Sequence, residues 1–268
     1  MPEPDLLHPP LAEDLALLRE AAHEGGRIAM RYFRQAPEVW MKGGTSPVSE
    51  ADFAVDKFLA EFLLSARPFY GWLSEETADS PERLAARRTF VVDPIDGTRG
   101  FLEGRDTWCV SIAVVEDGQP LAGVLDCPAT QEVFSAISGD GATMNGVSIR
   151  VREPHGSHPR VGGPKPLLAL AEKELGESFD KITYVPSLAY RVAMVASGTI
   201  DATFVRQNSN DWDLAAADLI LREAGGRILN RGGRMPVYAS ADPKHGALIA
   251  GSGTLLERLA PILQSEPN

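Results

Sequence analysis

The sequence predicts an α/β protein whose two halves are organised differently. In the first half, two helical stretches are followed by a run of consecutive short strands, which is typical of a meander. In the second half, helices and strands alternate, which favours helices packed on a mainly parallel sheet. Between them, residues 152–166 hold four prolines and three glycines without any hydrophobic period. We therefore place a domain boundary there.

Two helices are expected near the N-terminus. Residues 11–35 carry apolar side chains near a helical period, after a proline-rich arm at residues 1–10. A second helix begins at Ser49, which is a typical N-cap residue with Asp52 three positions later.

The strands of the first half are predicted from β-branched and aromatic residues. The expected strands cover residues 69–73, 89–92, 107–115, 121–126 and 132–136. The second of them is expected to stop at Asp93-Pro94, because proline removes a ladder donor and restricts the residue before it. Residues 139–146 are rich in turn formers and are expected to form a loop.

The second half repeats short helices and strands. The expected helices cover residues 167–174, 187–197, 212–224 and 254–263, and the expected strands cover residues 182–185, 200–205, 227–229 and 247–250. Asp211 is expected to cap the third of these helices, and Asp213 lies in its first turn, where negative charge is favoured.

Composition limits the classes of function. The chain has 268 residues, with 44% hydrophobic and 24% charged residues, as expected for a globular protein. Its net charge of −11 argues against a nucleic-acid polymer as partner, because such partners need a basic surface. The same charge suits an enzyme of anionic phosphates only if bound cations reverse the local field.

The two cysteines and the N-terminus bear on location. Residues 1–10 lack the apolar run of a secretory signal, no segment reaches the length of a membrane span, and few cysteines indicate a reducing cytoplasm. Cys109 and Cys127 lie on two predicted strands joined by a turn, so they could face each other. Free buried thiols are the expected state.

Two carboxylates stand next to each other in residues 93–98. Asp93 and Asp96 follow a predicted strand, and adjacent carboxylates repel each other unless a cation lies between them. Mg²⁺ prefers such oxygen ligands, and Gly97 would let a phosphate approach the backbone. Asp, Pro and Gly are also ordinary turn residues, so this hexapeptide alone is equally consistent with a surface turn.

Three further residues have a functional and an ordinary interpretation. Glu75 follows a predicted strand, so it would meet Asp93 at one sheet edge if their strands pair, although it could equally be a solvated glutamate. Lys42 precedes a glycine-rich stretch and could approach a phosphate, although most lysines are simply solvated. Asp52 and Asp213 could do no more than stabilise a helix dipole.

Taken together, these segments resemble the inositol monophosphatase superfamily of Mg²⁺-dependent, Li⁺-sensitive phosphatases. The resemblance spans nearly the whole chain in the expected order. It is carried by Ser74-Glu75-Glu76, by Asp93-Pro94-Ile95-Asp96-Gly97-Thr98, by Trp212-Asp213 and by Glu223-Ala224-Gly225-Gly226, with support from residues 46–52 and 141–146.

The resemblance implies a layered α/β/α/β/α sandwich of the inositol monophosphatase and fructose-1,6-bisphosphatase type. Residues 1–152 would form an α+β domain with an antiparallel sheet and most metal ligands. Residues 153–268 would form an α/β domain with a mainly parallel sheet that contributes Asp213.

The same resemblance assigns roles to residues. Two or three Mg²⁺ ions would be bound by Glu75, Asp93, the carbonyl of Ile95, Asp96 and Asp213. Catalysis would involve Glu75, Thr98 and Asp52, the last two orienting the attacking water. The substrate phosphate would be bound by Gly97, Thr98 and Lys42, and substrate specificity would depend on Arg99 and Arg191.

The substrate is expected to be a small phosphorylated molecule. Leu73 before Ser74-Glu75-Glu76 and Arg99 after Thr98 resemble 3′(2′),5′-bisphosphate nucleotidases, although Gly100 departs from their usual acid. Inositol-1-monophosphatase is the first alternative, and histidinol-phosphate phosphatase, which shares Trp108, is the second. A catalytically silent phosphate-binding relative and a Ca²⁺-stabilised structural protein are the non-enzyme alternatives. Relatives also imply a homodimer.

Overall fold

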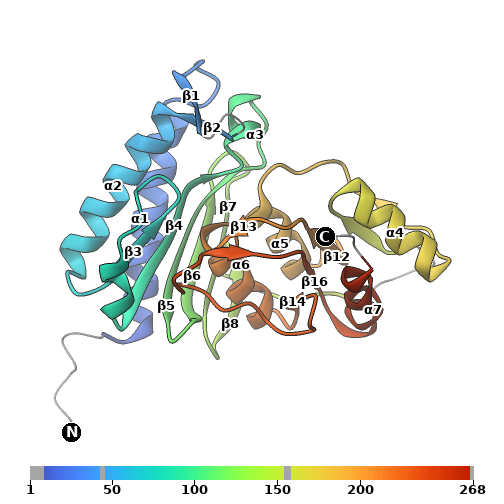
Figure 1. The fold of residues 1–268 in the computed structure, drawn as a ribbon. Helices are drawn as coiled ribbons and strands as arrows, with labels where there is room; N and C mark the ends of the chain where they lie inside the picture. The colour runs from blue at the N-terminus through green and yellow to red at the C-terminus, as the bar shows by residue number, and fades with distance from the viewer. Residues whose placement is uncertain (1–8, 43–45, 154–157, 266–268) are drawn as a thin grey trace, which may run out of the picture.

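A computed structural model describes residues 9–42, 46–153 and 158–265 of the chain. Most of the expected N-terminal arm, residues 43–45 and residues 154–157 of the expected boundary lie outside the described residues. Two large sheets and three helical layers alternate across the molecule (Figure 1). The implied α/β/α/β/α layering is therefore confirmed.

The first sheet has seven strands in sequence order, β3-β4-β5-β6-β7-β8-β9. Its strands are β3 (Gly71–Ser74), β4 (Arg88–Asp96), β5 (Cys109–Glu116), β6 (Gln119–Cys127), β7 (Glu132–Ile137), β8 (Gly141–Met144) and β9 (Val147–Ile149). Only β3 and β4 pair in parallel, and all later neighbours are antiparallel, as the meander predicted. The expected loop at residues 139–146 is wrong in part, because it contains β8 between two tight turns.

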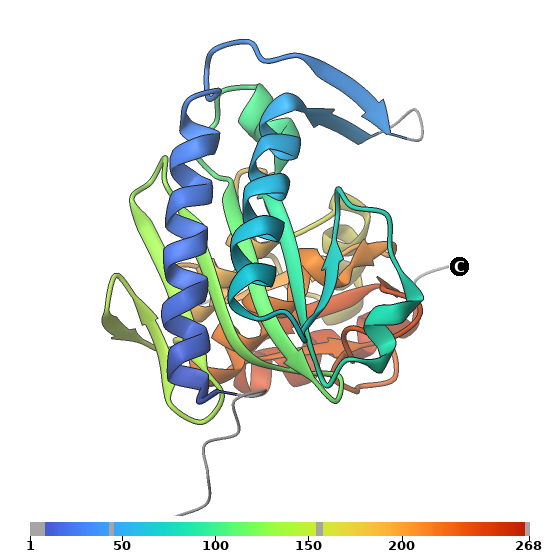
Figure 2. The ribbon, with the colours of Figure 1, turned by 90° about the vertical axis from the view of Figure 1, so that its left-hand side faces the viewer.

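Helices α1 (Leu11–Met30) and α2 (Glu50–Ala66) cover the outer face of this sheet, side by side (Figure 2). Ser49 is the N-cap of α2, as predicted. The first helix ends at Met30 and not at residue 35, since the chain turns there and Arg34 takes a left-handed conformation (φ +62°). A hairpin of β1 (Val39–Lys42) and β2 (Ser46–Ser49) joins the two helices.

The second sheet has the order β11-β10-β12-β16-β14. Its strands are β10 (Arg160–Gly162), β11 (Asp180–Lys181), β12 (Ala202–Val205), β14 (Arg227–Asn230) and β16 (Leu248–Gly251). β10 pairs in parallel with β11 and β12, whereas β16 is antiparallel to β12 and β14. Four of these five strands therefore run in the same direction, as expected for a mainly parallel sheet, although β16 makes two of the four neighbouring pairs antiparallel. The unit β12–α6–β14 does place two strands in the same direction, but β16 inserts between them in the opposite one.

The helices of the second half agree with the prediction. They are α4 (Lys165–Leu175), α5 (Leu188–Ala196), α6 (Asp211–Glu223) and α7 (Gly253–Leu259), the last continued by a 3₁₀ turn at Ala260–Gln264. The expected strand at residues 182–185 is not formed, and these residues run irregularly after the short β11. The smaller elements are the 3₁₀ turn Pro81–Ala85, α3 (Thr98–Leu102), β13 (Ser209–Asn210) and β15 (Lys244–His245).

One hydrophobic core joins the two halves of the chain. Helices α5 and α6 lie between the two sheets, while α4 and α7 cover the far face of the second sheet (Figure 1). The central cluster combines Val91 and Leu125 of the first sheet with Ala216 of α6 and Ile228 of the second sheet. A division between residues 152 and 153 therefore separates two sheets but not two cores. No helix among the described residues is both long and apolar enough to cross a bilayer.

Candidate active site

The ends of β3 and β4 bring two acids to one edge of the first sheet. β3 and β4 are parallel, and the Glu75 amide continues their ladder by donating to the Val92 carbonyl at 3.2 Å. Glu75 therefore lies beside Asp93, as the sequence predicted for paired strands. The parallel pairing of β3 and β4 therefore places the motif at Glu75 next to the motif at Asp93.

The chain does not leave the sheet at Asp93-Pro94, as the sequence had suggested. β4 runs to Asp96, and its pairing with β5 shifts register between Asp93 and Asp96. Such a bulge accommodates proline because its nitrogen is not needed in the ladder. The Asp93 carboxylate accepts a hydrogen bond from the Ile95 amide (3.0 Å), which fixes the carboxylate at the bulge.

Gly97 connects this bulge to the short helix α3. It is the N-cap residue and has a left-handed conformation (φ +95°). A Cβ atom at this position would also lie 3.0 Å from the Cβ of Ser187. The turn therefore requires glycine both for its backbone angle and for the close approach of a second segment.

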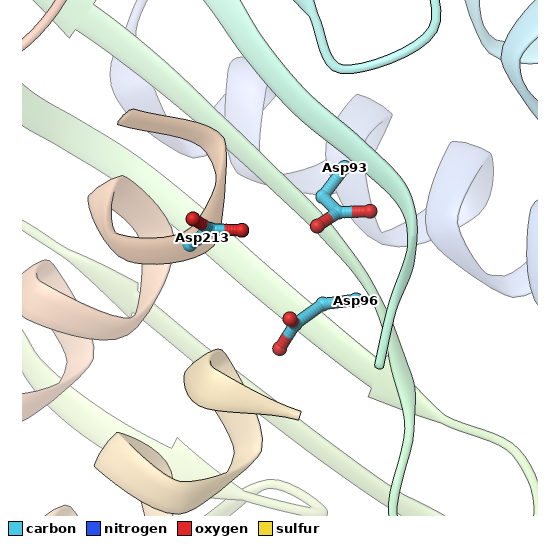
Figure 3. A group of neighbouring side chains, drawn as sticks. All are labelled: Asp93, Asp96 and Asp213. Atoms are coloured by element: carbon cyan, nitrogen blue, oxygen red, sulfur yellow. The ribbon is translucent and has the colours of Figure 1, made fainter. Parts of the chain in front are cut away.

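Three aspartates converge where the end of β4 meets the first turn of α6 (Figure 3). Asp93 and Asp96 come from β4, and Asp213 comes from the first turn of α6. Each offers one carboxylate oxygen, and these oxygens all lie within 4.8 Å of one another. The structure thus brings together residues that are more than a hundred positions apart in the sequence.

Asp213 is held by the beginning of its own helix. Its Oδ2 accepts a hydrogen bond from the amide of Asn210 (2.7 Å), which is the N-cap residue. The prediction that Asp211 caps this helix is wrong. Asp211 is the first helical residue, and its buried carboxylate instead binds the amide of Ala239 and the ring of His245, both at 2.7 Å.

Asp96 binds the N-terminus of α5. Its Oδ2 accepts hydrogen bonds from the Ser187 hydroxyl and the Ala189 amide (2.7 Å), and Oδ1 lies 3.3 Å from the Leu188 amide. Anionic groups are favoured at a helix N-terminus. Sequence reasoning missed this contact, although Ser187 at the predicted helix start was a local signal for a cap.

Glu75 lies next to the three aspartates and is paired with Lys42. The Lys42 ammonium is 3.7 Å from Glu75 Oε1, donates to the Glu75 carbonyl at 3.1 Å and forms an ion pair with Glu76. Lys42 was expected at the substrate phosphate. In the structure it contacts two glutamates at the edge of the site, so the phosphate role stays a prediction.

Thr98 and Asp52 are in contact, as expected for a pair that acts together. The Thr98 hydroxyl oxygen is 3.0 Å from both Asp52 Oδ1 and the Ile95 carbonyl oxygen. The second oxygen of Asp52 accepts hydrogen bonds from the amide and hydroxyl of Ser49 (2.8 and 2.6 Å). The capping box of α2 therefore also fixes Asp52 in the site.

Burial raises the pKa of every acid in the cluster. Desolvation, with repulsion from Glu75 and Asp96, raises the pKa of Asp93 well above its ordinary value. Desolvation, only partly opposed by Lys42, raises the pKa of Glu75 to about 8. Desolvation and Asp96 raise the pKa of Asp213 to about 7. A divalent cation with oxygen ligands would offset this repulsion, and the all-oxygen donor set fits Mg²⁺.

A pocket of about 510 Å³ opens beside Asp96 and Asp213. Arg191 lines this pocket, and its guanidinium donates to the carbonyls of Val185 (3.3 Å) and Phe204 (3.4 Å). Arg99, the other expected specificity residue, is exposed on α3 and is not part of the pocket lining.

Both cysteines are buried and free, and their thiols interact across β5 and β6. The expectation of free buried thiols is confirmed, and the structure adds the contact between them that the sequence left open. The Cys109 sulfur also lies 4.0 Å from Asp96 Oδ2, so the dithiol forms part of the wall behind the carboxylates.

The layered fold and the site together define a class of protein. Buried carboxylates that converge beside a pocket with basic side chains are typical of hydrolases that use metal ions on phosphorylated small molecules. Comparison with known proteins identifies the family. The model of the inositol monophosphatase family matches residues 11–268, so the chain belongs to this family and is a phosphomonoester hydrolase.

Individual relatives agree with this assignment. An inositol-1-monophosphatase of Rhizobium meliloti is 29% identical over 93% of this chain and 96% of its own length. A histidinol-phosphatase of Mycobacterium tuberculosis is 35% identical over 80% of this chain and 83% of its own length. The crystal structure of the extragenic suppressor protein suhB from Bartonella henselae superposes with a TM-score of 0.82, with 28% identity over 95% of this chain and all of that chain (100%).

Proposed function

We propose that the protein is a Mg²⁺-dependent phosphomonoesterase that releases phosphate from a 3′(2′),5′-bisphosphate nucleotide, with 3′-phosphoadenosine 5′-phosphate as the model substrate. The observation that supports the chemistry is the convergence of Asp93, Asp96 and Asp213 beside a pocket. The preference for a bisphosphate is supported by Leu73 before the Glu75 motif and by the basic side chains of the pocket.

The proposed metal ligands are the carboxylates of Glu75, Asp93, Asp96 and Asp213 and the carbonyl of Ile95. Two or three ions are proposed, because four carboxylates carry more charge than one Mg²⁺ neutralises. Bound Mg²⁺ would lower the pKa of a water and neutralise charge on the phosphoryl oxygens. The raised pKa values of these acids reflect how poorly the chain tolerates their charge on its own.

Thr98 and Asp52 would orient the attacking water. A hydroxyl has one proton to donate, so Thr98 can donate to only one of its two neighbours at a time. When it donates to Asp52, its lone pairs are free to accept a hydrogen bond from a water. Asp52 is fixed by Ser49 in this arrangement and can take up a proton through Thr98.

The scissile phosphate would lie at the start of α3. The first amides of a helix have no partner within it, and those of Gly97 and Thr98 belong to this turn. Lys42 is proposed to add a positive charge to the phosphate site, which would require its ammonium to give up part of its contact with Glu75 and Glu76. Thr98 would thus take part both in binding the phosphate and in orienting the water, whereas Lys42 and Asp52 would contribute from β1 and α2.

Two other substrates have specific support. The family name and the Rhizobium relative favour inositol 1-phosphate, and the Mycobacterium relative favours histidinol phosphate. A neutral inositol ring would leave the basic residues of the pocket without a partner, which is why we prefer the bisphosphate. A homodimer and a cytoplasmic location stay predictions from the sequence.

A phosphate-release panel tests the proposal. The panel contains 3′-phosphoadenosine 5′-phosphate, inositol 1-phosphate, histidinol phosphate and fructose 1,6-bisphosphate, each measured with Mg²⁺ and with excess chelator. We expect release that requires Mg²⁺ and is fastest with the nucleotide. Asp93→Asn should lower kcat/KM by about 100-fold or more, because a metal contributes several kcal/mol to transition-state stabilisation.

Asp93 suits this test because its one hydrogen bond within the described chain, from Ile95, can also be accepted by asparagine. Phosphate release that persists in chelator would contradict the metal mechanism. Binding of the nucleotide without release of phosphate would identify the silent relative, and faster hydrolysis of another substrate would reassign the specificity.

A further inference from the structure

The pocket beside the carboxylates is basic in an acidic protein. Among the described residues that line it, four are basic, and the only acids are the proposed metal ligands Asp96 and Asp213. The basic residues are Lys165, Lys181, Arg191 and Arg206. The whole chain, by contrast, has 26 basic and 37 acidic residues. The excess of positive charge at the pocket is therefore a local feature that composition does not explain.

These cations come from four segments that the fold brings together. Lys165 is the first residue of α4, Lys181 ends β11, Arg191 lies on α5 and Arg206 follows β12. The N-terminus of α4 also borders the pocket through Pro164, so the partial positive charge of an eleven-residue helix adds to theirs. The pocket thus brings together basic side chains that repel one another, and it contains fewer carboxylates than basic groups.

Three of the four cations are not neutralised by a carboxylate at ion-pair distance. Lys181 is paired with Glu172 at 2.7 Å. The side chains of Lys165 and Arg206 form no hydrogen bond or ion pair with any residue that the structure describes. Arg191 binds two carbonyl oxygens, and its Nε is buried without a partner in the described structure. Buried donors of this kind are normally satisfied, by a ligand if not by the protein.

The rest of the lining is mainly apolar. Leu168, Ile182 and Val205 contribute to the walls, and Tyr184, which is 61% exposed, contributes an aromatic ring. A volume of about 510 Å³ is within the usual range for small-molecule sites. The pocket therefore suits a ligand with a flat or apolar body that carries an anionic group.

We propose that Lys165, Arg191 and Arg206 form a second anion subsite, which binds a non-reacting phosphate of the substrate while the metal centre holds the phosphate that is cleaved. This inference rests on the proposed phosphomonoesterase function and specifies its substrate class: phosphomonoesters with a second phosphate on a body of nucleoside size. Charge-assisted hydrogen bonds from Arg and Lys to phosphate would then satisfy the buried guanidinium.

A matched pair of substrates tests the subsite. 3′-Phosphoadenosine 5′-phosphate and adenosine 3′-phosphate differ only in the second phosphate. We expect the wild-type enzyme with Mg²⁺ to have a higher kcat/KM for the bisphosphate. Arg206→Gln and Lys165→Gln should each lower the ratio of the two kcat/KM values by about 10- to 100-fold, because each substitution removes a charge-assisted hydrogen bond to the second phosphate.

Two further measurements make the result decisive. Lys57→Gln removes one positive charge from the exposed side of α2 and should leave the ratio unchanged. Calorimetric titration measures the affinity of the protein for each of the same two ligands and does not depend on catalysis. The bisphosphate should bind more tightly than the monophosphate only when Lys165 and Arg206 are present.

The outcomes separate the two proposals. An equal loss on both substrates, or a bisphosphate preference that survives both substitutions, would overturn the subsite and leave the phosphomonoesterase intact. Absence of turnover would overturn the proposed function, and the titration would then decide the subsite by itself. If the wild-type protein bound 3′-phosphoadenosine 5′-phosphate and adenosine 3′-phosphate with equal affinity, the subsite proposal would be overturned.

Discussion

Asp96 has two functions that the structure joins in one side chain. It offers an oxygen to the carboxylate cluster, and it caps α5 through Ser187 and Ala189. The helix it caps carries Arg191 into the pocket. Asp96 therefore links the proposed metal centre to the proposed substrate pocket, and a change at this residue would disturb both.

Gly97 allows a prediction at the residue scale. Gly97→Ala would place a side chain at φ +95° and within 3.0 Å of Ser187 Cβ, next to Thr98. We expect a loss of about 1–3 kcal/mol in the free energy of unfolding and a loss of activity of about 10-fold or more. Urea denaturation and phosphate release measure the two effects.

Gly146→Ala is the matched control. Gly146 also has a positive φ (+78°), but nothing lies within 4 Å of the added methyl group. It should cost stability through backbone strain alone and keep its activity. If both variants lost activity to the same extent, the loss would follow from instability and not from the geometry of the site.

At the same scale, the sequence predicted the acids of the site better than their partners. The family resemblance carried by the motifs around Asp93 and Asp213 implied that these two acids meet, and they do. The contacts of Asp96 with Ser187 and of Asp211 with His245 were not predicted. Such partners lie tens of residues away, and a local pattern does not show which side chain will arrive from a distant segment.

Among the secondary-structure elements, α6 determines where Asp213 lies. The helix packs between the two sheets through the small residues Ala215, Ala216 and Ala217. Gly123 on β6 faces it, and a Cβ there would lie 3.1 Å from Ala216 Cα. Small residues on both sides allow a close approach of helix and sheet, which sets the position of the first turn of α6 relative to β4.

Overpacking this contact should therefore affect metal binding. We expect Ala216→Leu to lower the free energy of unfolding by about 1–3 kcal/mol and to raise the Mg²⁺ concentration needed for half-maximal activity. Ala171→Leu is the control, because Ala171 is equally buried but lies in α4 on the far side of the second sheet. It should cost similar stability without changing the Mg²⁺ dependence. The same shift in both variants would disprove the link between helix position and metal affinity.

Helices and strands were predicted well where the signal lies in the local sequence. They were predicted poorly where the arrangement depends on which strands pair with each other. All four larger helices of the second half lie close to the positions that the sequence predicted, although the cap predicted for α6 was wrong. The antiparallel insertion of β16 between β12 and β14 was not predictable, since strand order depends on tertiary packing. The short β10 also escaped prediction, because prolines and glycines surround it.

At the scale of the whole molecule, the buried acids predict an opposing effect of pH and metal. The pKa values of Glu75 and Asp213 are raised to about 8 and about 7, above their ordinary values of 4.5 and 3.8. The folded, metal-free protein thus holds these protons more tightly than the unfolded chain. The stability they contribute is fully present below their ordinary pKa values, declines as pH rises above them and is fully lost above about pH 8.

Thermal unfolding checks this prediction. In chelator, Tm should be lower at about pH 8.5 than at about pH 6, and the rise in Tm on adding Mg²⁺ should be larger at the higher pH, because metal and protons compete for the same oxygens. Asp213→Asn should reduce the difference between the two pH values. A larger stabilisation by Mg²⁺ at the lower pH would contradict this assignment of the buried acids.

The shared core has a consequence for biosynthesis. A nascent chain that has left the ribosome only as far as residue 152 contains Glu75, Asp93 and Asp96 but lacks α5 and α6, which cover the inner face of its sheet. Its apolar surface would then be open to chaperones and proteases. Asp213 belongs to α6, the helix that covers this surface, so a product truncated at residue 152 would lack one of the proposed metal ligands as well as a complete fold.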